Sequence, residues 1–195
     1  SKPAVKGLAV EEGDTIASGQ PAMAQVRMND GGILVIRPNT RLVIKAFQFS
    51  GKEDGSERAH FSLEKGGVRA VTGEIGKTNK QNYLIQTPSA SIGVRGTDHE
   101  PFTVEAADAA LVPAGTYDKV NVGATVVENA KGVVTVQPGE VGFAANAATA
   151  PVILPEVPAL YSSAGDGVKV AKRGSQSSGR ARASSSSAQG AGDTA

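Results

Sequence analysis

The sequence predicts an all-β protein, and three observations support this fold class. Glycine is frequent, with 24 residues, whereas aromatic residues make up only 4% of the 195-residue chain. Apolar and polar residues alternate over short runs, which is the pattern of half-buried strands. Turn-forming residues separate these runs at intervals of about 8 to 12 residues, as they do in sandwiches, barrels and solenoid-like β-structures.

The first half of the chain contains several short predicted strands. Residues 22–28 alternate, and Asn29-Asp30-Gly31-Gly32 supplies the positive φ values of a hairpin turn before a return strand at 33–36. A second hairpin is expected at Glu64-Lys65-Gly66-Gly67, between strands at 60–63 and 68–71. Other strands are expected by the same criteria at residues 5–10, 14–16, 42–49 and 83–87, with polar loops at 50–58 and 73–82.

The second half continues the pattern after Pro88, which interrupts the strand at 83–87. Residues 105–114 are rich in alanine and predict one short helical turn. Strands are expected at 92–94, 102–104, 116–120, 124–128, 133–136 and 140–144, with Gly123, an Asn129–Gly132 turn and Pro138-Gly139 separating the last four. We therefore expect one β-domain over residues 1–144.

The composition changes after Ala144. Residues 145–164 form an Ala/Pro-rich linker, and its closely spaced prolines favour an extended, polyproline-like conformation. Val152, Ile153 and Leu154 lie between these prolines, and we expect them to dock on the domain edge or on a partner.

The tail, residues 165–195, is a low-complexity segment of Ser, Gly, Ala and Arg. Such a segment cannot bury enough apolar surface to fold, so we expect it to be disordered. Its arginines, Arg173, Arg180 and Arg182, are expected to belong to a solvated linker, because no aromatic residue lies beyond Tyr161 to stack on bases.

The composition also excludes several functional classes. The chain has no cysteine, which excludes disulfides, zinc–thiolate sites and thiol catalysis. Its formal net charge is +1, so the folded part offers no basic footprint for nucleic acid. No apolar run reaches the roughly 18 residues of a membrane-spanning helix.

Residues 86–100 contain the most distinctive polar cluster, Asp98-His99-Glu100. On one strand, Asp98 and Glu100 share a face while His99 points to the other, so three adjacent residues do not converge on a metal ion. We expect hydrogen-bonded polar groups here, and no metal site. Ser89 and Ser91 lack the Gly-x-Ser-x-Gly context of a catalytic serine, so we expect no catalytic residue.

Gly93-Val94-Arg95-Gly96 does not match a phosphate-binding loop, because both glycine-rich phosphate motifs are missing. We expect the two glycines to permit a bend or a close backbone approach. Arg95 can then donate its guanidinium N–H groups to loop carbonyls or to a carboxylate such as Asp98. Structural bracing is the leading interpretation of Arg95, and ligand contact is the alternative.

Residues Thr87-Pro88-Ser89-Ala90-Ser91-Ile92-Gly93-Val94-Arg95-Gly96-Thr97 resemble the signature of the FecR-like domain family. Residues 11–16, 29–40, 63–69 and 137–140 resemble further motifs of this family, in the same order along the chain. The resemblance covers roughly residues 8–144, and several ordered motifs together are specific. It identifies Pro88, Gly93, Arg95, Gly96, Thr97 and Asp98 as structural signature residues.

The resemblance implies an extracytoplasmic all-β module of two packed, twisted antiparallel sheets, similar to a sandwich or a solenoid. Family members include the periplasmic part of transmembrane anti-sigma regulators that sense iron–chelate uptake, and stand-alone exported proteins. This sequence shows no sigma-binding helices and no membrane segment, and a Pro- and Ser-rich tail follows Ala144. We therefore expect a stand-alone exported protein of the periplasm or the cell surface.

Our leading hypothesis is a non-enzymatic module that binds another envelope protein, with signalling as its role. We expect no cofactor and no small-molecule ligand. The alternative is a cell-surface or filament subunit that binds copies of itself, which the apolar Val152-Ile153-Leu154 run suggests. A polysaccharide-binding module is a third hypothesis, but only Tyr83, Tyr117 and Tyr161 are available as tyrosines and the chain has no Trp.

Overall fold

The structure is a computed structural model, and it describes residues 2–52, 55–78 and 80–162. Strands dominate this part of the chain, so the predicted all-β class is confirmed. The strands are β1 (Thr15–Ala17), β2 (Ala24–Arg27), β3 (Ile33–Ile36), β4 (Arg41–Gln48), β5 (Arg58–Val71), β6 (Tyr83–Gln86), β7 (Ser91–Val104), β8 (Gly115–Asn129), β9 (Gly132–Val136), β10 (Val141–Ala144) and β11 (Val152–Ile153). The helical segments are α1 (Glu74–Thr78), η1 (Lys80–Asn82), η2 (Ala106–Asp108) and η3 (Ala159–Tyr161). The predicted disordered tail lies outside the described residues.

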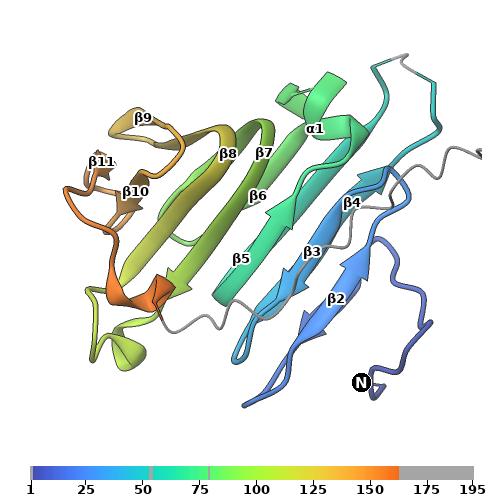
Figure 1. The fold of residues 1–195 in the computed structure, drawn as a ribbon, viewed down its shortest axis with the longest axis horizontal. Helices are drawn as coiled ribbons and strands as arrows, with labels where there is room; N and C mark the ends of the chain where they lie inside the picture. The colour runs from blue at the N-terminus through green and yellow to red at the C-terminus, as the bar shows by residue number, and fades with distance from the viewer. Residues whose placement is uncertain (1, 53–54, 79, 163–195) are drawn as a thin grey trace, which may run out of the picture. The chain divides into compact units, whose positions relative to one another are not determined.

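All described strands belong to one hydrogen-bonded sheet, which runs from β1 to β11 without closing on itself (Figure 1). Most neighbours are antiparallel, but β5 and β6 pair in parallel. A parallel pair needs a crossover connection, and α1 and η1 provide it. The expectation of purely antiparallel pairing is therefore wrong at this position. The packing of two separate sheets, which the resemblance implies, is not confirmed.

Three strands are much longer than the others, namely β5, β7 and β8, which run side by side in Figure 1. Each pairs with different neighbours in its two halves. The first half of β5 lies between β4 and β6, and its second half lies between β3 and β7. The first half of β7 likewise pairs with β6, and its second half pairs with β5.

A glycine with a positive φ angle lies in the middle of each long strand: Gly66 at 75°, Gly96 at 61° and Gly123 at 79°. Glycine tolerates this conformation because it has no Cβ, and such residues form bulges that bend a strand. The register between β7 and β8 shifts between Arg95 and Asp98. A Cβ on Gly123 would lie 2.2 Å from the carbonyl oxygen of Gly96, so the two strands bend where their backbones touch.

Because the long strands bend and continue, several sequence predictions are wrong. The hairpin expected at 64–67 is wrong, because β5 runs through this stretch as one strand. The strands expected at 92–94 and 102–104 are the two ends of β7, and those expected at 116–120 and 124–128 belong to β8. Residues 5–10 form no strand, and their side chains are largely exposed.

Other predicted turns are confirmed. The hairpin at 29–32 joins β2 to β3, with Gly31 at a φ of 83°. The predicted helical turn in 105–114 corresponds to η2. Pro88 lies in the turn between β6 and β7, as expected.

Buried apolar side chains form two clusters. The inner cluster takes side chains from both halves of β5 and β8 and from the first half of β7, for example Phe61 and Val68 of β5 and Ile92 of β7. The outer cluster is smaller and consists of Val104, Tyr117, Val141 and Tyr161, with the partly buried Phe102, Ala109, Val112, Phe143, Leu154 and Leu160 packed against it. Since side chains alternate along a strand, β10 contributes Ala144 to the inner cluster and its neighbour Phe143 to the outer one.

Candidate functional site: a charged ladder on the outer face of the sheet

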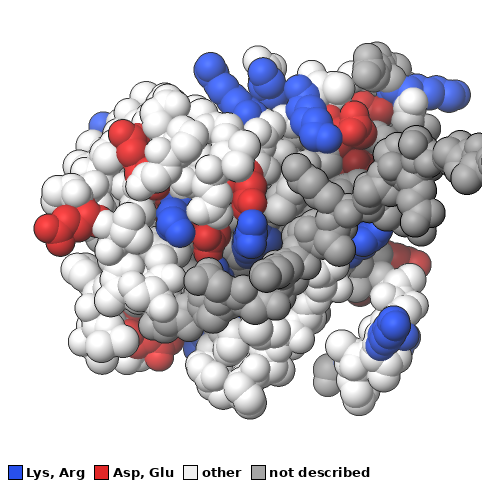
Figure 2. Space-filling view, viewed as in Figure 1, with Lys and Arg blue, Asp and Glu red and all other residues white. Residues whose placement is uncertain are grey.

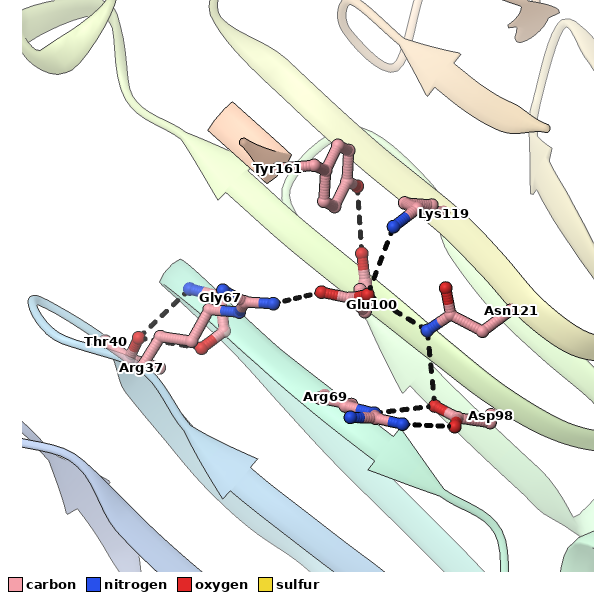
Figure 3. Close-up of polar contacts among 9 residues, drawn as sticks. All are labelled: Arg37, Thr40, Gly67, Arg69, Asp98, Glu100, Lys119, Asn121 and Tyr161. Atoms are coloured by element: carbon pink, nitrogen blue, oxygen red, sulfur yellow. Dashed lines mark hydrogen bonds and ion pairs between the residues drawn. The ribbon is translucent and has the colours of Figure 1, made fainter. Parts of the chain in front are cut away.

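Polar side chains from four neighbouring segments form one connected network on the outer face of the sheet (Figure 3). We call these residues the ladder: Arg37, which follows β3, Arg69 of β5, Asp98 and Glu100 of β7, and Lys119 and Asn121 of β8. Figure 2 shows that charges of both signs lie close together over these strands. Asp98 and Glu100 are two residues apart and share a face, as the sequence predicts.

Arg69 and Asp98 form a two-pronged ion pair. Nε and Nη2 of Arg69 donate hydrogen bonds to the two carboxylate oxygens of Asp98, at 2.9 and 2.6 Å. Burial by itself would raise the pKa of Asp98, but the hydrogen bonds and the charge of Arg69, assisted by Asn121, outweigh it and lower that pKa below its ordinary value. Asp98 is therefore ionised at neutral pH.

Glu100 connects most of the ladder. Nη2 of Arg37 donates a hydrogen bond to Oε2 of Glu100, while Lys119 Nζ lies 3.5 Å from Oε1. The side chains of Arg37 and Glu100 are only 12% and 10% exposed, so this ion pair is almost buried. Asn121 donates to Oε1 of Glu100 at 2.9 Å and also reaches Asp98 at 3.4 Å, which joins the two ion pairs.

Tyr161 of η3 lies over one side of the ladder. Its hydroxyl donates a hydrogen bond to the main-chain oxygen of Glu100 at 2.9 Å, and Lys119 Nζ lies 5.5 Å from the centre of its ring. Burial, together with the charges of Asp118 and Glu100, raises the pKa of Tyr161 well above its ordinary value. The phenol therefore stays protonated and able to donate at neutral pH.

His99 lies on the opposite face of β7, as predicted. Its Nδ1 is 2.8 Å from Oδ1 of Asp118, and both side chains are fully buried. His99 Nε2 and Asp118 Oδ2 have no hydrogen-bond partner among the described residues. A histidine–aspartate pair is part of a catalytic triad, but both side chains of this pair lie inside the protein, away from solvent.

The signature residues surround the bend of β7. Gly96 forms the bulge, and Thr97 is buried behind it, where its N–H donates to Thr72 Oγ1 at 2.8 Å. Gly93 lies in β7 with no atom within 4 Å of an added Cβ, so the close approach suggested for both glycines is not found there. The signature stretch therefore builds the point where β7 changes partners.

The pairing of Arg95 with Asp98 that the sequence suggested is not found in the described structure. Arg95 is exposed, and Asp98 receives its ion pair from Arg69 of β5. The bulge at Gly96 explains the difference, because it turns Arg95 towards solvent. Sequence reasoning also missed Arg37, Lys119, Asn121 and Tyr161. The sequence did contain a signal for Arg69. In Val68-Arg69-Ala70 a charged residue alternates with apolar ones inside a strand, which places Arg69 on the face opposite the core.

The candidate partner-binding residues have different environments. Val152 and Ile153 form β11 and are 49% and 37% exposed, whereas Leu154 packs against the outer cluster. β11 pairs with β10 of the same chain. The sequence predicts that this segment docks on the domain edge or on a partner. In the described structure it lies on the edge of its own domain.

Two further sequence interpretations concern ligands. Tyr83, Tyr117 and Tyr161 are all buried, so none of the three is available for stacking on a sugar. Within residues 2–52, 55–78 and 80–162, no three His, Asp or Glu side chains are placed to hold a metal ion. The acidic and basic side chains of the ladder pair with one another. They present hydrogen-bonding groups of both charges, which suits contact with another polar surface.

Comparison with known proteins identifies the family. Residues 14–142 match the FecR protein family, which is about two thirds of the chain. The chain belongs to this family. The FecR match includes the bend of β7 and every ladder residue, but it ends before Tyr161. No curated protein matches the chain.

Two crystal structures of a "putative anti-sigma factor" from Parabacteroides distasonis ATCC 8503 share the fold of this FecR domain. They superpose with TM-scores of 0.56 and 0.57, each at 14% sequence identity. The alignments cover 75% of this chain and 61% of the other chain. The similarity therefore extends over less than two thirds of those proteins. In the part of the chain that the structure describes, no helix has the length and apolarity to cross a membrane.

Proposed function

We propose that this FecR domain is a non-enzymatic, extracytoplasmic protein-binding module that acts in signalling at the bacterial cell envelope. Family membership carries the proposal, because residues 14–142 match a family that the crystal structures of a "putative anti-sigma factor" resemble in fold. The arrangement of polar groups supports it. The buried histidine faces away from solvent, and the polar groups of the outer face form a paired ladder in which Arg69 and Asp98 keep contact with solvent.

The outer face near the ladder is the region we propose for partner contact. Val122 of β8 is paired with Asp98 across the sheet and is 60% exposed, which is high for an apolar strand residue. Arg95 lies in the same bend and is exposed as well. Val122 supplies an apolar contact, and arginine is a residue type that is enriched in protein interfaces.

Site-specific photo-crosslinking in the cell that makes the protein tests this proposal. A photoreactive residue at Val122 is expected to capture one envelope protein, identified by mass spectrometry. Val5 provides a matched control, because it is also a valine, is 67% exposed and lies outside the sheet. Equal capture at both positions, or capture of nothing at Val122, would contradict the proposed surface.

Extracytoplasmic placement is tested separately. The outer membrane of the cells is permeabilised while the inner membrane stays intact. Added protease is then expected to digest the protein, while a cytoplasmic marker survives. Protection of the protein until the inner membrane is also broken would overturn this placement.

Self-assembly is the second candidate function, and one observation favours it. β11 is the last strand of the sheet, and its exposed Val152 and Ile153 offer an edge that a second copy can extend. Light scattering of the full chain is expected to show concentration-dependent oligomers that Ile153→Lys abolishes. A monomer at all concentrations would remove this candidate.

A further inference from the structure

The segment after β10 crosses the outer face of the sheet. We call residues 151–162 the strap. It contains Pro151, Pro155 and Pro158, and exposed residues 145–150 connect it to β10. β11 pairs with β10, and the N–H of Leu154 donates to the carbonyl oxygen of Val141 at 2.9 Å. The strap is thus an extended segment added to the edge of the sheet.

Tyr161 fastens the far end of the strap. Its hydroxyl bonds to the main-chain oxygen of Glu100, and its ring meets the Phe102 ring edge-on, with centroids 6.5 Å apart. The backbone bonds inside the strap are confined to its last turn, from Tyr161 to Pro158 and from Ser162 to Ala159. The strap is therefore held by its contacts with the sheet and not by structure of its own.

The strap covers a surface that is unusual for a free sheet face. Beneath it lie the outer-cluster residues Phe102, Tyr117 and Phe143, and the rings of Tyr117 and Phe143 are 4.5 Å apart. Leu154, Leu160 and Tyr161 fill this surface from above. Contiguous aromatic and aliphatic surface beside charged groups is the usual composition of a peptide-binding site.

We infer that the outer face of β7, β8 and β10 is a binding surface for an extended apolar protein segment that carries a tyrosine, and that the strap occupies this surface until such a segment displaces it. The inference rests on the proposed protein-binding function and names its surface and the chemistry of the partner. The strap itself shows that chemistry, since it docks by one edge strand, two leucines and one tyrosine.

Displacement is physically reasonable because the contacts of the strap lie mainly at its two ends, through β11 and Leu154 at one end and Leu160 and Tyr161 at the other. A segment with exposed side chains and few backbone bonds opens at a lower free energy than the core of a protein. A site that is occupied by its own chain binds a competitor with an apparent affinity reduced by the fraction of open molecules. Weakening the strap therefore strengthens binding of the competitor.

The test uses a fluorescent peptide with the sequence of residues 151–162, titrated into the full chain. Removing the Tyr161 hydroxyl in Tyr161→Phe deletes one hydrogen bond, so we expect peptide affinity to rise about fivefold. Tyr161→Ala is expected to raise it further. Val157→Ala is the matched control, because this strap residue is exposed and should leave affinity unchanged.

Specificity is checked with the same peptide carrying Ala in place of Tyr161, which is expected not to bind the Tyr161→Ala chain. Equal affinity of the natural peptide for wild type and Tyr161→Ala, or equal binding of both peptides, would overturn the inference. Association of the Tyr161→Ala chain with the wild-type chain, measured by mixing the two, would overturn the assignment to a different protein, because the wild-type copy would then supply the segment.

Amide hydrogen exchange gives an independent readout that does not need the peptide. In Tyr161→Phe, the amides of Leu154 and of the β10–β11 pair are expected to exchange about fivefold faster together, while those of the inner part of β7 stay unchanged. Exchange of the strap amides only with global unfolding would show that the strap does not open. Failure here leaves crosslinking at Val122 unaffected, so the two proposals fail separately.

Discussion

The two faces of β7 and β8 each carry a hydrogen-bonded pair of an acidic and a basic side chain, in very different surroundings. On the inner face, His99 and Asp118 are fully buried and each has an atom without a partner among the described residues. On the outer face, Arg69 and Asp98 pair through two hydrogen bonds and keep contact with solvent. Asp98 and His99 are neighbours in β7, but side chains alternate along a strand, so one faces the outside and the other the core.

The difference teaches that position within the sheet, and not the type of residue, sets the role of a charge. A buried pair brings a large desolvation penalty and is strongly destabilising when one partner is lost. A pair that touches solvent contributes little to stability and remains available for contact with a partner. The inner pair is therefore structural, and the Arg69–Asp98 pair of the outer ladder is the one that solvent and a partner can reach.

The largest effect is expected from breaking the inner pair. Asp118→Ala leaves the His99 imidazole buried with no partner, and we expect a loss of about 3 kcal/mol in the free energy of unfolding. Urea denaturation followed by far-UV circular dichroism measures it. Asp118→Asn, which keeps an acceptor oxygen, should lose less. A loss below about 1 kcal/mol for Asp118→Ala would mean that the inner pair resembles the outer one.

The Arg37–Glu100 pair lies on the outer face but is almost buried. It therefore tests whether burial or the face of the sheet decides how much a pair contributes to stability. Glu100→Gln removes the charged acceptor from Arg37, and we expect a loss of about 2 kcal/mol. A double-mutant cycle with Arg37→Met isolates the coupling between the two side chains. Coupling near zero would place this pair with ordinary surface pairs.

The bend that separates the two halves of β7 can be tested with its glycines. Gly96→Ala puts a Cβ at a φ of 61°, which costs about 1 kcal/mol in the left-handed region. Gly93→Ala is the control, because no positive φ and no close atom restrict that position. Thermal denaturation should separate the two variants by several degrees. Equal stabilities would show that Gly96 is not required for the bend.

The smallest effect is expected for Asp98, and it depends on pH. The pKa of Asp98 is lowered in the folded state, so its contribution is present above the ordinary aspartate pKa of about 4 and is lost as the pH falls through the lowered value. Asp98→Asn should cost no more than about 1 kcal/mol at pH 7, because Arg69 is partly exposed. Below the lowered pKa, where Asp98 is protonated in the folded protein, the variant and wild type should converge. A difference that does not shrink as the pH falls below about 4 would assign the effect to packing.

Sequence reasoning placed individual side chains on the correct faces. The alternation in Asp98-His99-Glu100 correctly separated His99 from its neighbours, and the turns at 29–32 and at Pro88 were read from their own residues. It failed at Arg95 because a bulge breaks alternation, and the true partner of Asp98 lies on β5, 29 residues away. Lys119 and Asn121 were missed for the same reason, since strand register is a long-range property.

The sequence by itself determined the all-β class, the FecR signature and the positions of the flexible glycines. Only the tertiary structure decided whether each glycine ends a strand or bends it. Gly66 and Gly123 were read as turn or boundary residues, yet β5 and β8 continue through them, whereas the bend that the sequence allowed at Gly96 lies inside β7. A positive φ suits a hairpin and a bulge equally well. Hydrogen-bonding neighbours on both sides of the strand decide between them, and those neighbours come from distant parts of the chain.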